Sequence, residues 1–367
     1  MNESRLPPVD SAQRRLRMPV RLDSLLVSVT EACHVGCRHC GFIGSTRDRE
    51  AEPDEMYAWV RQACDYGVPM MIFTGGEPFE RFDVLSGGVA AAAEFGVDIG
   101  IFTSSYWAKT REVADSTLAK LPGVSWMYLS TDVFHQRSVP YEYVYNAIEA
   151  SLAAGVRTIV LCITYTNEEE LHQVRDRYEA YRDVVIFHED RVIPTPYLSK
   201  VLKHQAPKIP PLPENYGRMC YLLTPLVNPN GDLISCHIGK VGAHRDVRDL
   251  PYWLGNLREQ RFGDIMAGAR QRRDYQFLRT HGPKGIAQLL ADNPALTETV
   301  GSDGFVNCCN LCFSVLGKPD GRQALHDHVA QGSVQKQIDT WLTLAWHEGP
   351  IVDPAEESLL PVGKEGN

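Results

Sequence analysis

The sequence lacks an excess of basic residues, and it lacks long apolar runs. Its 367 residues carry 37 Lys and Arg against 46 Asp and Glu, a formal net charge of −9. A nucleic-acid groove needs a basic surface, so no nucleic-acid partner is expected. No window of about 20 apolar residues is present to span a membrane, and the N-terminus has no apolar run of a signal peptide. We therefore expect a cytoplasmic protein that does not enter membranes.

Cysteine is the informative part of the composition. The chain has ten cysteines, too sparse for a small disulfide scaffold and too clustered for incidental core residues. In a compartment where thiols stay reduced, clustered cysteines indicate metal binding or catalysis.

Apolar strands alternate with helices over the first half of the chain. Strands are expected at residues 22–30, 68–74, 97–105, 124–132, 156–166 and 183–193. Helices are expected at residues 53–67, 81–96, 111–121, 141–155 and 167–182. This alternation predicts an α/β fold with a parallel sheet of buried strands and right-handed crossovers, either open or curved into a partial barrel. The functional loops then follow the carboxyl ends of the strands.

The remaining segments suggest further divisions of the chain. Residues 1–21 form a lead-in, and the proline-rich residues 194–216 form a linker. Residues 217–320 hold a second group of cysteines, a turn at Pro229-Asn230-Gly231, a helix at 262–271 and a break at 281–285. Residues 321–367 are expected to be a closing helix and a frayed tail.

Three cysteines lie in the loop after the first expected strand. Cys33, Cys37 and Cys40 follow one another at spacings of four and three residues. Three thiolates from one loop suit a cubane iron–sulfur cluster, in which the fourth iron stays open to an exogenous ligand. A zinc loop completed by His34 and His39 is the alternative.

A glycine-rich turn ends the second expected strand. Gly75 and Gly76 expose backbone N–H and C=O groups with no side chain in the way, and Glu77 adds a carboxylate suited to an ammonium group. Pro78 completes the motif. Alone this turn is common in proteins and is a weak signal. After the second strand, behind a three-cysteine loop that follows the first strand, it becomes a specific signal.

The two motifs together resemble the radical S-adenosylmethionine (SAM) superfamily. The resemblance covers about residues 22–193 and implies a partial (βα)6 TIM-like barrel. It implies that Cys33, Cys37 and Cys40 hold a [4Fe–4S] cluster whose fourth iron binds SAM. One electron then cleaves SAM to a 5′-deoxyadenosyl radical, which abstracts a hydrogen atom from the substrate. The family often has an aromatic residue at the position of His39, so packing near the adenine is expected to differ.

Polar residues end the third and fourth expected strands. By analogy with the family, Ser104 and Ser130 are expected to meet the SAM carboxylate and ribose, and Asp132 is a candidate for ribose or substrate. His135 is a candidate base at the rim of the same face. The alternative is that the strand-end residues only cap strands and form turns, and that the histidine is a solvated loop residue.

The second group of cysteines resembles the auxiliary-cluster extension called the SPASM or twitch domain. The resemblance implies a second [4Fe–4S] cluster held by Cys220, Cys236, Cys309 and Cys312, and a structural zinc site is the alternative. Cys308 is spare, is able to exchange roles with Cys309, and is a candidate hydrogen-atom donor to a substrate radical. The other two cysteines are expected in the core.

The resemblance implies an oxidoreductase- or isomerase-type enzyme. The short lead-in favours a small-molecule biosynthetic substrate, which would be dehydrogenated or epimerised with help from the auxiliary cluster. Modification of a ribosomally made peptide by crosslinking or epimerisation is the alternative. An electron donor such as flavodoxin or ferredoxin is implied as a partner. A non-enzymatic iron–sulfur carrier or metal-binding scaffold is the rival from another class.

Overall fold

The computed structural model describes residues 18–37, 39–40, 50–192, 208–218, 220, 224–236, 247–301 and 303–351. Most of the expected lead-in, much of the linker and nearly all of the tail lie outside these ranges. Within the described ranges, no helix is long and apolar enough to cross a membrane.

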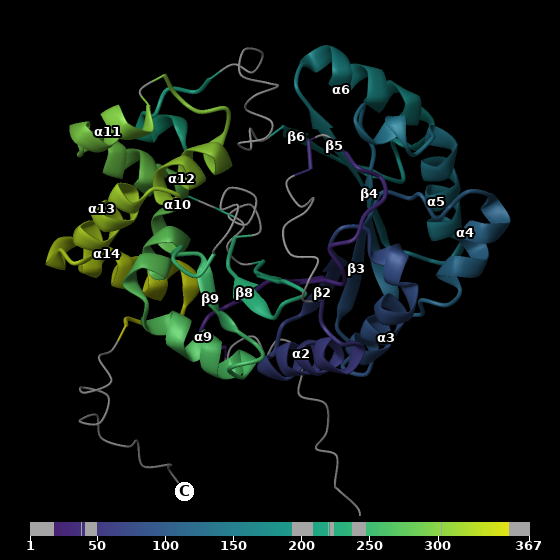
Figure 1. Ribbon diagram of the computed structural model, residues 1–367, viewed down its shortest axis with the longest axis horizontal. Helices are drawn as coiled ribbons and strands as arrows, with labels where there is room; N and C mark the ends of the chain where they lie inside the picture. The colour runs from purple at the N-terminus through teal and green to yellow at the C-terminus, as the bar shows by residue number, and fades with distance from the viewer. Residues whose placement is uncertain are drawn as a thin grey trace, which may run out of the picture.

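Six parallel strands form the first part of the fold, in the order in which they occur in the chain (Figure 1). They are β1 (Leu25–Ser28), β2 (Met70–Thr74), β3 (Asp98–Thr103), β4 (Val124–Ser130), β5 (Thr158–Tyr165) and β6 (Ile186–Arg191). Each strand pairs in parallel with the next. The expected α/β fold with a partial (βα)6 barrel is confirmed.

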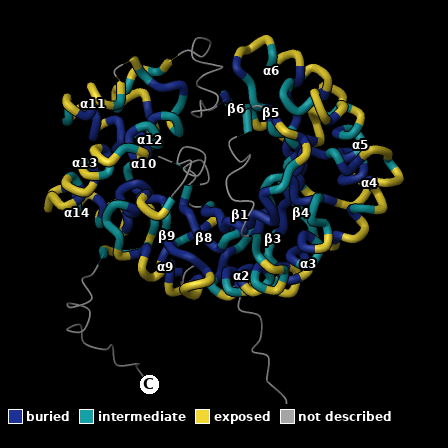
Figure 2. Tube along the Cα trace, in the orientation of Figure 1, coloured by how far each residue is buried: buried dark blue, intermediate teal, exposed yellow. Residues whose placement is uncertain are grey.

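The crossover helices cover the outer face of this sheet. They are α2 (Pro53–Tyr66), α3 (Phe82–Ala93), α4 (Arg111–Leu118), α5 (Tyr141–Ala153) and α6 (Glu168–Arg175). The helix α2 ends at Gly67, whose φ of 111° lets it close the last turn with hydrogen bonds to the carbonyls of Ala63 and Cys64. Figure 2 shows the strands buried and the helices exposed on their outer sides.

Two expectations for this part need correction. The helix expected over residues 167–182 changes to a tighter 3₁₀ helix at Asp176. The last strand is not a buried apolar run, because β6 alternates exposed and partly buried residues. Among the described strands it pairs with β5 alone, at one end of the strand order.

The sheet continues past β1 with strands from much later in the chain. They are β7 (Leu226–Val227), β8 (Asp232–Ile234) and β9 (Trp253–Asn256). The strand β7 pairs in parallel with β1, placing Leu26 beside Leu226, and β8 and β9 follow as antiparallel neighbours. The hairpin turns at Gly231, as expected, with a φ of 89°. One nine-stranded sheet therefore reaches from the barrel into the second group of cysteines.

Helices build the rest of the chain around a second apolar core. They are α9 (Phe262–Gln271), α10 (Arg273–Ala291), α11 (Pro294–Val300), α12 (Cys308–Leu316), α13 (Pro319–Val329) and α14 (Gly332–Trp341). The helix expected at residues 262–271 is confirmed as α9. In Figure 1 the helices α10–α14 stand opposite the barrel, with β8 and β9 between them.

Two further expectations are revised in this region. The break expected at residues 281–285 is a kink inside α10, at Gly282, where the backbone leaves helical geometry. A Cβ there would lie 2.2 Å from the carbonyl oxygen of Arg218, so only glycine fits. The single closing helix is divided, because Gln331 takes an extended conformation between α13 and α14, and a π-helical turn follows at Leu342–Trp346.

Candidate functional site

The three cysteines of the first motif gather in one small apolar cluster beyond the end of β1. Cys37 is buried there with Val35 and Val139, and Cys33 and Cys40 pack against them while remaining partly exposed. Burial raises the pKa of Cys33 to about 11 in the metal-free protein. The hydroxyl of Ser138 donates to the carbonyl of Val35 and so ties the loop to the segment after β4.

The glycine-rich turn lies directly against the cysteine loop. The Gly76 N–H donates to the carbonyl of Thr30 at 2.7 Å, and the Glu77 N–H donates to the carbonyl of Ala32 at 2.8 Å. A Cβ on Gly75 would lie 2.3 Å from the Thr30 oxygen, and one on Gly76 would lie 2.1 Å from the Ala32 oxygen. Both glycines are therefore required for this close approach.

The carboxylate of Glu77 is buried and joins β2 to β3. It accepts hydrogen bonds from the Thr103 hydroxyl at 2.8 Å and from the Ser104 N–H and hydroxyl at 2.8 and 2.6 Å. Burial raises the pKa of Glu77, and the donors from Ser104 and Thr103 oppose that rise. The side chains of Glu77 and Ser104, both predicted to meet SAM, therefore contact each other in the metal-free protein.

The neighbouring Ser105 has an unusual backbone that sequence reasoning did not single out. Its φ of 70° is rare for a residue with a side chain. Its buried hydroxyl has no hydrogen-bond partner among the described residues. Such strain and unmet hydrogen bonding are features of ligand sites. The run of polar residues at the end of β3 was the sequence signal that could have pointed to Ser105.

The predicted SAM-contacting residue Ser130 is partly exposed at the end of β4.

Asp132 and His135 form a buried pair that faces the cysteine loop. The His135 Nδ1 lies 2.8 Å from the Asp132 Oδ2, and the exposed fractions of the two side chains are 13% and 1%. Burial lowers the pKa of His135, but the Asp132 carboxylate outweighs it and holds that pKa well above its usual value. The neighbouring Cys37 side chain raises the pKa of His135 further. The sequence had placed the histidine at the rim of this face, and the structure places it beside the Asp132 carboxylate with 13% of its side chain exposed.

His39 closes the other side of this pair. Its Nε2 lies 3.7 Å from the Asp132 Oδ2, and its ring packs against Phe134 at 4.6 Å between centroids. Burial lowers the pKa of His39 to about 4. The imidazole of His34 instead contacts Glu80 and the ring of Tyr106. The two histidines considered as zinc ligands are thus engaged elsewhere.

The second group of cysteines converges on one hollow between β8, the start of α12 and the kink of α10. Its lining residues are Cys220, Cys236, Tyr252, Leu278, Gly282, Pro283, Cys308, Cys309, Cys312 and Phe313. Cys308 is exposed, and the other four cysteines are partly exposed. The structure thus brings the four cysteines of the implied ligand set together, with Cys308 beside them.

Tyr252 is a member of this hollow that sequence reasoning missed. It is buried, and its hydroxyl has no hydrogen-bond partner among the described residues. Burial raises its pKa well above the usual value, and the nearby thiols of Cys312, Cys236, Cys220 and Cys309 raise it further. These four thiols are the predicted ligand set.

The spacing of the sulfurs bears on the zinc alternatives. Zn–S bonds of about 2.3 Å in a tetrahedron place thiolates about 3.8 Å apart. The described residues include all ten cysteines, yet their only group of three ligand atoms within 4.8 Å of one another is His39, Asp132 and His135. Neither cysteine set therefore presents three ligand atoms within 4.8 Å of one another, as a zinc tetrahedron requires.

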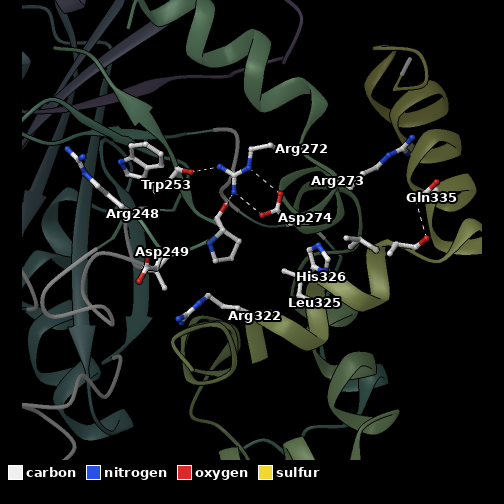
Figure 3. A pocket seen from close by; sticks show the side chains of 14 residues that line it. Arg248, Asp249, Trp253, Arg272, Arg273, Asp274, Arg322, Leu325, His326 and Gln335 are labelled. Carbon is white, nitrogen blue, oxygen red and sulfur yellow. Dashed lines mark hydrogen bonds and ion pairs between the residues drawn. The ribbon is translucent and has the colours of Figure 1, made fainter. Parts of the chain in front are cut away.

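A larger hollow lies away from both cysteine sets and is lined by several arginines. It measures about 560 Å³ and lies between the β9 hairpin, the start of α10 and α13. Figure 3 shows the Arg272 guanidinium held by Asp274 and by the backbone carbonyls of Pro251 and Trp253. Arg322 binds the last carbonyls of α12. These arginines stabilise the fold, and we assign the hollow no ligand.

Comparison with known proteins identifies the barrel. Residues 27–178 match the radical SAM superfamily. This part of the chain is therefore similar to the radical SAM superfamily. The matched residues include the cysteine loop, the glycine-rich turn and the ends of β3 and β4.

Curated relatives match a stretch of the chain of similar length. It is 27% identical over 164 residues to a protein named GTP 3′,8-cyclase from Campylobacter curvus, covering 41% of this chain and 50% of the relative. It is 29% identical over 167 residues to a probable GTP 3′,8-cyclase from Methanothermobacter marburgensis, covering 44% and 54%. The chain thus matches about half the length of these curated relatives.

A solved structure shares the fold over most of the chain. Streptococcus suis SuiB, bound to its precursor peptide SuiA, aligns with a TM-score of 0.51 at 16% identity. The alignment covers 78% of this chain and 76% of SuiB. The likeness therefore extends beyond the barrel into the C-terminal helices.

Proposed function

We propose that the protein abstracts a hydrogen atom from a small-molecule biosynthetic substrate, using SAM and two [4Fe–4S] clusters. When bound, the SAM-binding cluster and SAM supply the carbon-centred radical for this step. The observation that carries the proposal is the contact between the two motifs, in which Gly76 and Glu77 donate to the carbonyls of Thr30 and Ala32. This contact joins the turn predicted to bind SAM to the loop predicted to hold the cluster.

The chain's own residues position and shield this site. Glu77 fixes the relative position of β2 and β3 through Thr103 and Ser104. The apolar packing of Val35 and Val139 around Cys37 keeps water from one side of the cysteine loop. Because Cys33 and Cys40 remain partly exposed, the opposite side is available to ligands.

The auxiliary cluster is assigned to Cys220, Cys236, Cys309 and Cys312. Their common hollow and the orientation of Tyr252 toward these four thiols support the assignment. Cys308 is the exposed member of the group, and it interacts electrostatically with Asp190 at the end of β6. We assign it as the thiol that returns a hydrogen atom to a substrate radical, because it is the exposed cysteine of the group and is left over from the ligand set.

The substrate class has two candidates. The curated relatives are named for a nucleotide substrate, which supports a small molecule. SuiB was solved with a precursor peptide, which keeps peptide modification as the second candidate. Reduction of either cluster requires an electron donor, for which a flavodoxin or ferredoxin is proposed.

Anaerobic reconstitution tests the cofactors. The wild-type protein is expected to hold about eight irons per chain and to release 5′-deoxyadenosine from SAM with dithionite. Cys33→Ala should remove about four irons and abolish SAM cleavage, whereas the matched control Cys64→Ala, in the core of α2, should keep both. Full SAM cleavage by the Cys33 variant would refute the proposal.

A second comparison tests the auxiliary ligands. Cys309→Ala should lose about four irons, and Cys308→Ala should keep about eight while altering the product formed. Deuterium transfer from labelled small molecules or peptides into 5′-deoxyadenosine then identifies the substrate class. Deuterium transfer from a labelled peptide and from no small molecule would show that the substrate is a peptide and would overturn the small-molecule proposal.

A further inference from the structure

We propose that His39, Asp132 and His135 bind a divalent transition-metal ion, Zn²⁺ or Fe²⁺, beside the first cysteine loop. Two imidazoles and one carboxylate would hold this ion and leave further coordination positions open for water or a substrate oxygen. A side chain that ligates a metal is not free to act as a base, so the site replaces the roles considered for Asp132 and His135 from the sequence. It is separate from both proposed clusters, whose ligands are cysteines.

The three side chains meet at distances that suit a mononuclear ion. Each offers one ligand atom, and the three atoms lie within 4.8 Å of one another. The Asp132 Oδ2 lies 2.8 Å from the His135 Nδ1 and 3.7 Å from the His39 Nε2. Metal–nitrogen and metal–oxygen bonds of about 2.0–2.2 Å place neighbouring ligand atoms about 3.0–3.5 Å apart. The two measured distances lie on either side of this range, so small side-chain rotations complete the site.

A simple ion pair does not account for the atoms that meet here. The Asp132 Oδ2 and the His135 Nδ1 are buried, and neither has a hydrogen-bond partner among the described residues. They lie 2.8 Å apart, yet they do not hydrogen bond to each other. Buried polar atoms are normally satisfied, and two that are not, side by side, indicate a site for an ion. A shared cation satisfies both atoms at once.

The carboxylate of Asp132 is held in one orientation by the turn after β4. Its Oδ1 accepts the backbone N–H groups of Phe134 and His135, both at 2.9 Å. Its Oδ2 is thereby left to face the two imidazoles. The ligating carboxylates of metal sites are commonly fixed in this way by hydrogen bonds to their other oxygen. The turn therefore sets the direction of the carboxylate before any ion arrives.

His39 brings the third ligand atom from the cysteine loop. Its ring packs on Phe134 at 4.6 Å between centroids and meets the His135 ring edge-on at 5.3 Å. The side chains of His39 and Asp132 have exposed fractions of 12% and 1%. A carboxylate so far removed from water is costly unless a positive charge lies beside it. A bound cation supplies that charge and links the cysteine loop to the turn after β4.

The ligand types select the class of ion. Mg²⁺ and Ca²⁺ prefer sites made of oxygen atoms, whereas imidazole nitrogens suit zinc and iron. Two histidines and one carboxylate occur in catalytic zinc sites and in non-haem iron sites, both of which keep open positions. The shared chemistry is therefore that of a divalent ion with nitrogen and oxygen ligands and room for an exogenous donor.

The test adds Zn²⁺ to the full-length protein after reconstitution, when the proposed clusters occupy the cysteines. Equilibrium dialysis followed by elemental analysis should give about one zinc per chain with the iron content unchanged. X-ray absorption at the zinc edge should show nitrogen and oxygen neighbours at about 2.0–2.2 Å and no sulfur at about 2.3 Å. Elemental analysis of protein isolated without added metal distinguishes zinc from iron as the native ion.

Variants connect the bound zinc to the three side chains. Asp132→Asn and His135→Gln should each weaken zinc binding by about 100-fold or more, because loss of a hydrogen-bond partner behind a ligand already costs about 10–100-fold. His188→Gln is the matched control. His188 also lies 2.8 Å from a carboxylate, that of Asp190, but this pair is exposed and belongs to no group of three ligand atoms within the described ranges. The control should bind zinc as the wild type does.

Each outcome decides for or against the site. Absence of bound zinc, sulfur neighbours in protein that keeps its iron, or unchanged affinity in the two variants overturns it. If Asp132→Asn and His135→Gln do not fold, His39→Gln decides, and its unchanged affinity also overturns the site. The measurement needs no SAM cleavage. A wild type that takes up no iron refutes the proposed clusters instead, and loss of nitrogen-bound zinc in the variants still supports this site.

Discussion

The carboxylate of Glu348 and the guanidinium of Arg279 form a buried ion pair, with Oε1 2.6 Å from Nη2 and exposed fractions of 3% and 0%. The same Oε1 accepts the backbone N–H of Arg21 at 2.7 Å. The pair therefore joins the segment before β1, the helix α10 and the end of the C-terminal helices. It stabilises the contact between the barrel and the second apolar core.

Substitution of this glutamate is expected to be costly. Glu348→Gln should lower the free energy of unfolding by about 3–5 kcal/mol, because it leaves the Arg279 charge buried without its partner. Urea denaturation monitored by circular dichroism measures the change. Glu94→Gln, which breaks the exposed pair with Arg61, should cost less than about 1 kcal/mol. Equal losses in the two variants would contradict the role given to the buried pair.

The close approach of the glycine-rich turn can be tested with one methyl group. Gly76→Ala places a Cβ 2.1 Å from the Ala32 carbonyl oxygen, so the turn and the cysteine loop must separate. The variant should lose about half of the reconstituted iron. Gly263→Ala is the matched control, because its Cβ would meet no atom within 4 Å. Its position in α9 should even favour the alanine by about 0.5–1 kcal/mol. Full iron content in Gly76→Ala would show that the turn does not hold the loop.

The buried hydroxyl of Tyr252 distinguishes the metal-free from the loaded protein. It has no hydrogen-bond partner among the described residues, so Tyr252→Phe should raise the melting temperature of protein prepared without iron by removing a cost of about 1–3 kcal/mol. After reconstitution the wild-type hydroxyl is expected to find a sulfur acceptor, and the advantage of phenylalanine should disappear. Differential scanning fluorimetry of both forms measures this. The same advantage in both would argue against a cluster at these four cysteines.

His281 predicts acid sensitivity for the second apolar core. It stacks on Phe277, and burial lowers its pKa from 6.5 to about 4, with Arg218 and His328 adding to the effect. Its folded-state pKa is depressed, so the unfolded chain takes up the proton first. The contribution of the neutral His281 imidazole to the free energy of unfolding is therefore complete above pH 6.5, and it is lost as the pH falls toward 4. Unfolding curves over this range should show a smaller slope with pH for His281→Phe than for the wild type. Identical slopes would contradict the assignment.

Much of the barrel could be predicted because its signals are local. The helix α2 begins at Pro53 and ends at Gly67, both visible in the sequence, and the strand after it is an apolar run. The cysteine loop and the glycine-rich turn were predictable for the same reason. Each lies within one short segment at the carboxyl end of a strand.

What could not be predicted depends on contacts between distant segments. Nothing near Leu226 indicates that it pairs with Leu26. The approach of His135 to Cys37 likewise depends on how the turn after β4 packs against the cysteine loop. The kink at Gly282 looked like a loop, because a Gly-Pro pair usually ends a helix, and only packing against Arg218 allows the helix to resume.

The pairing of β7 with β1 has a consequence for synthesis of the chain. When the ribosome has delivered β1 through β6, one edge of β1 still presents unpaired backbone groups, and its partner at Leu226–Val227 has not yet been made. An open edge of this kind is prone to pairing with other chains. Pairing of this edge of β1 is thus coupled to arrival of the segment between Cys220 and Cys236, so the edge is covered only when the second cysteine set begins to emerge.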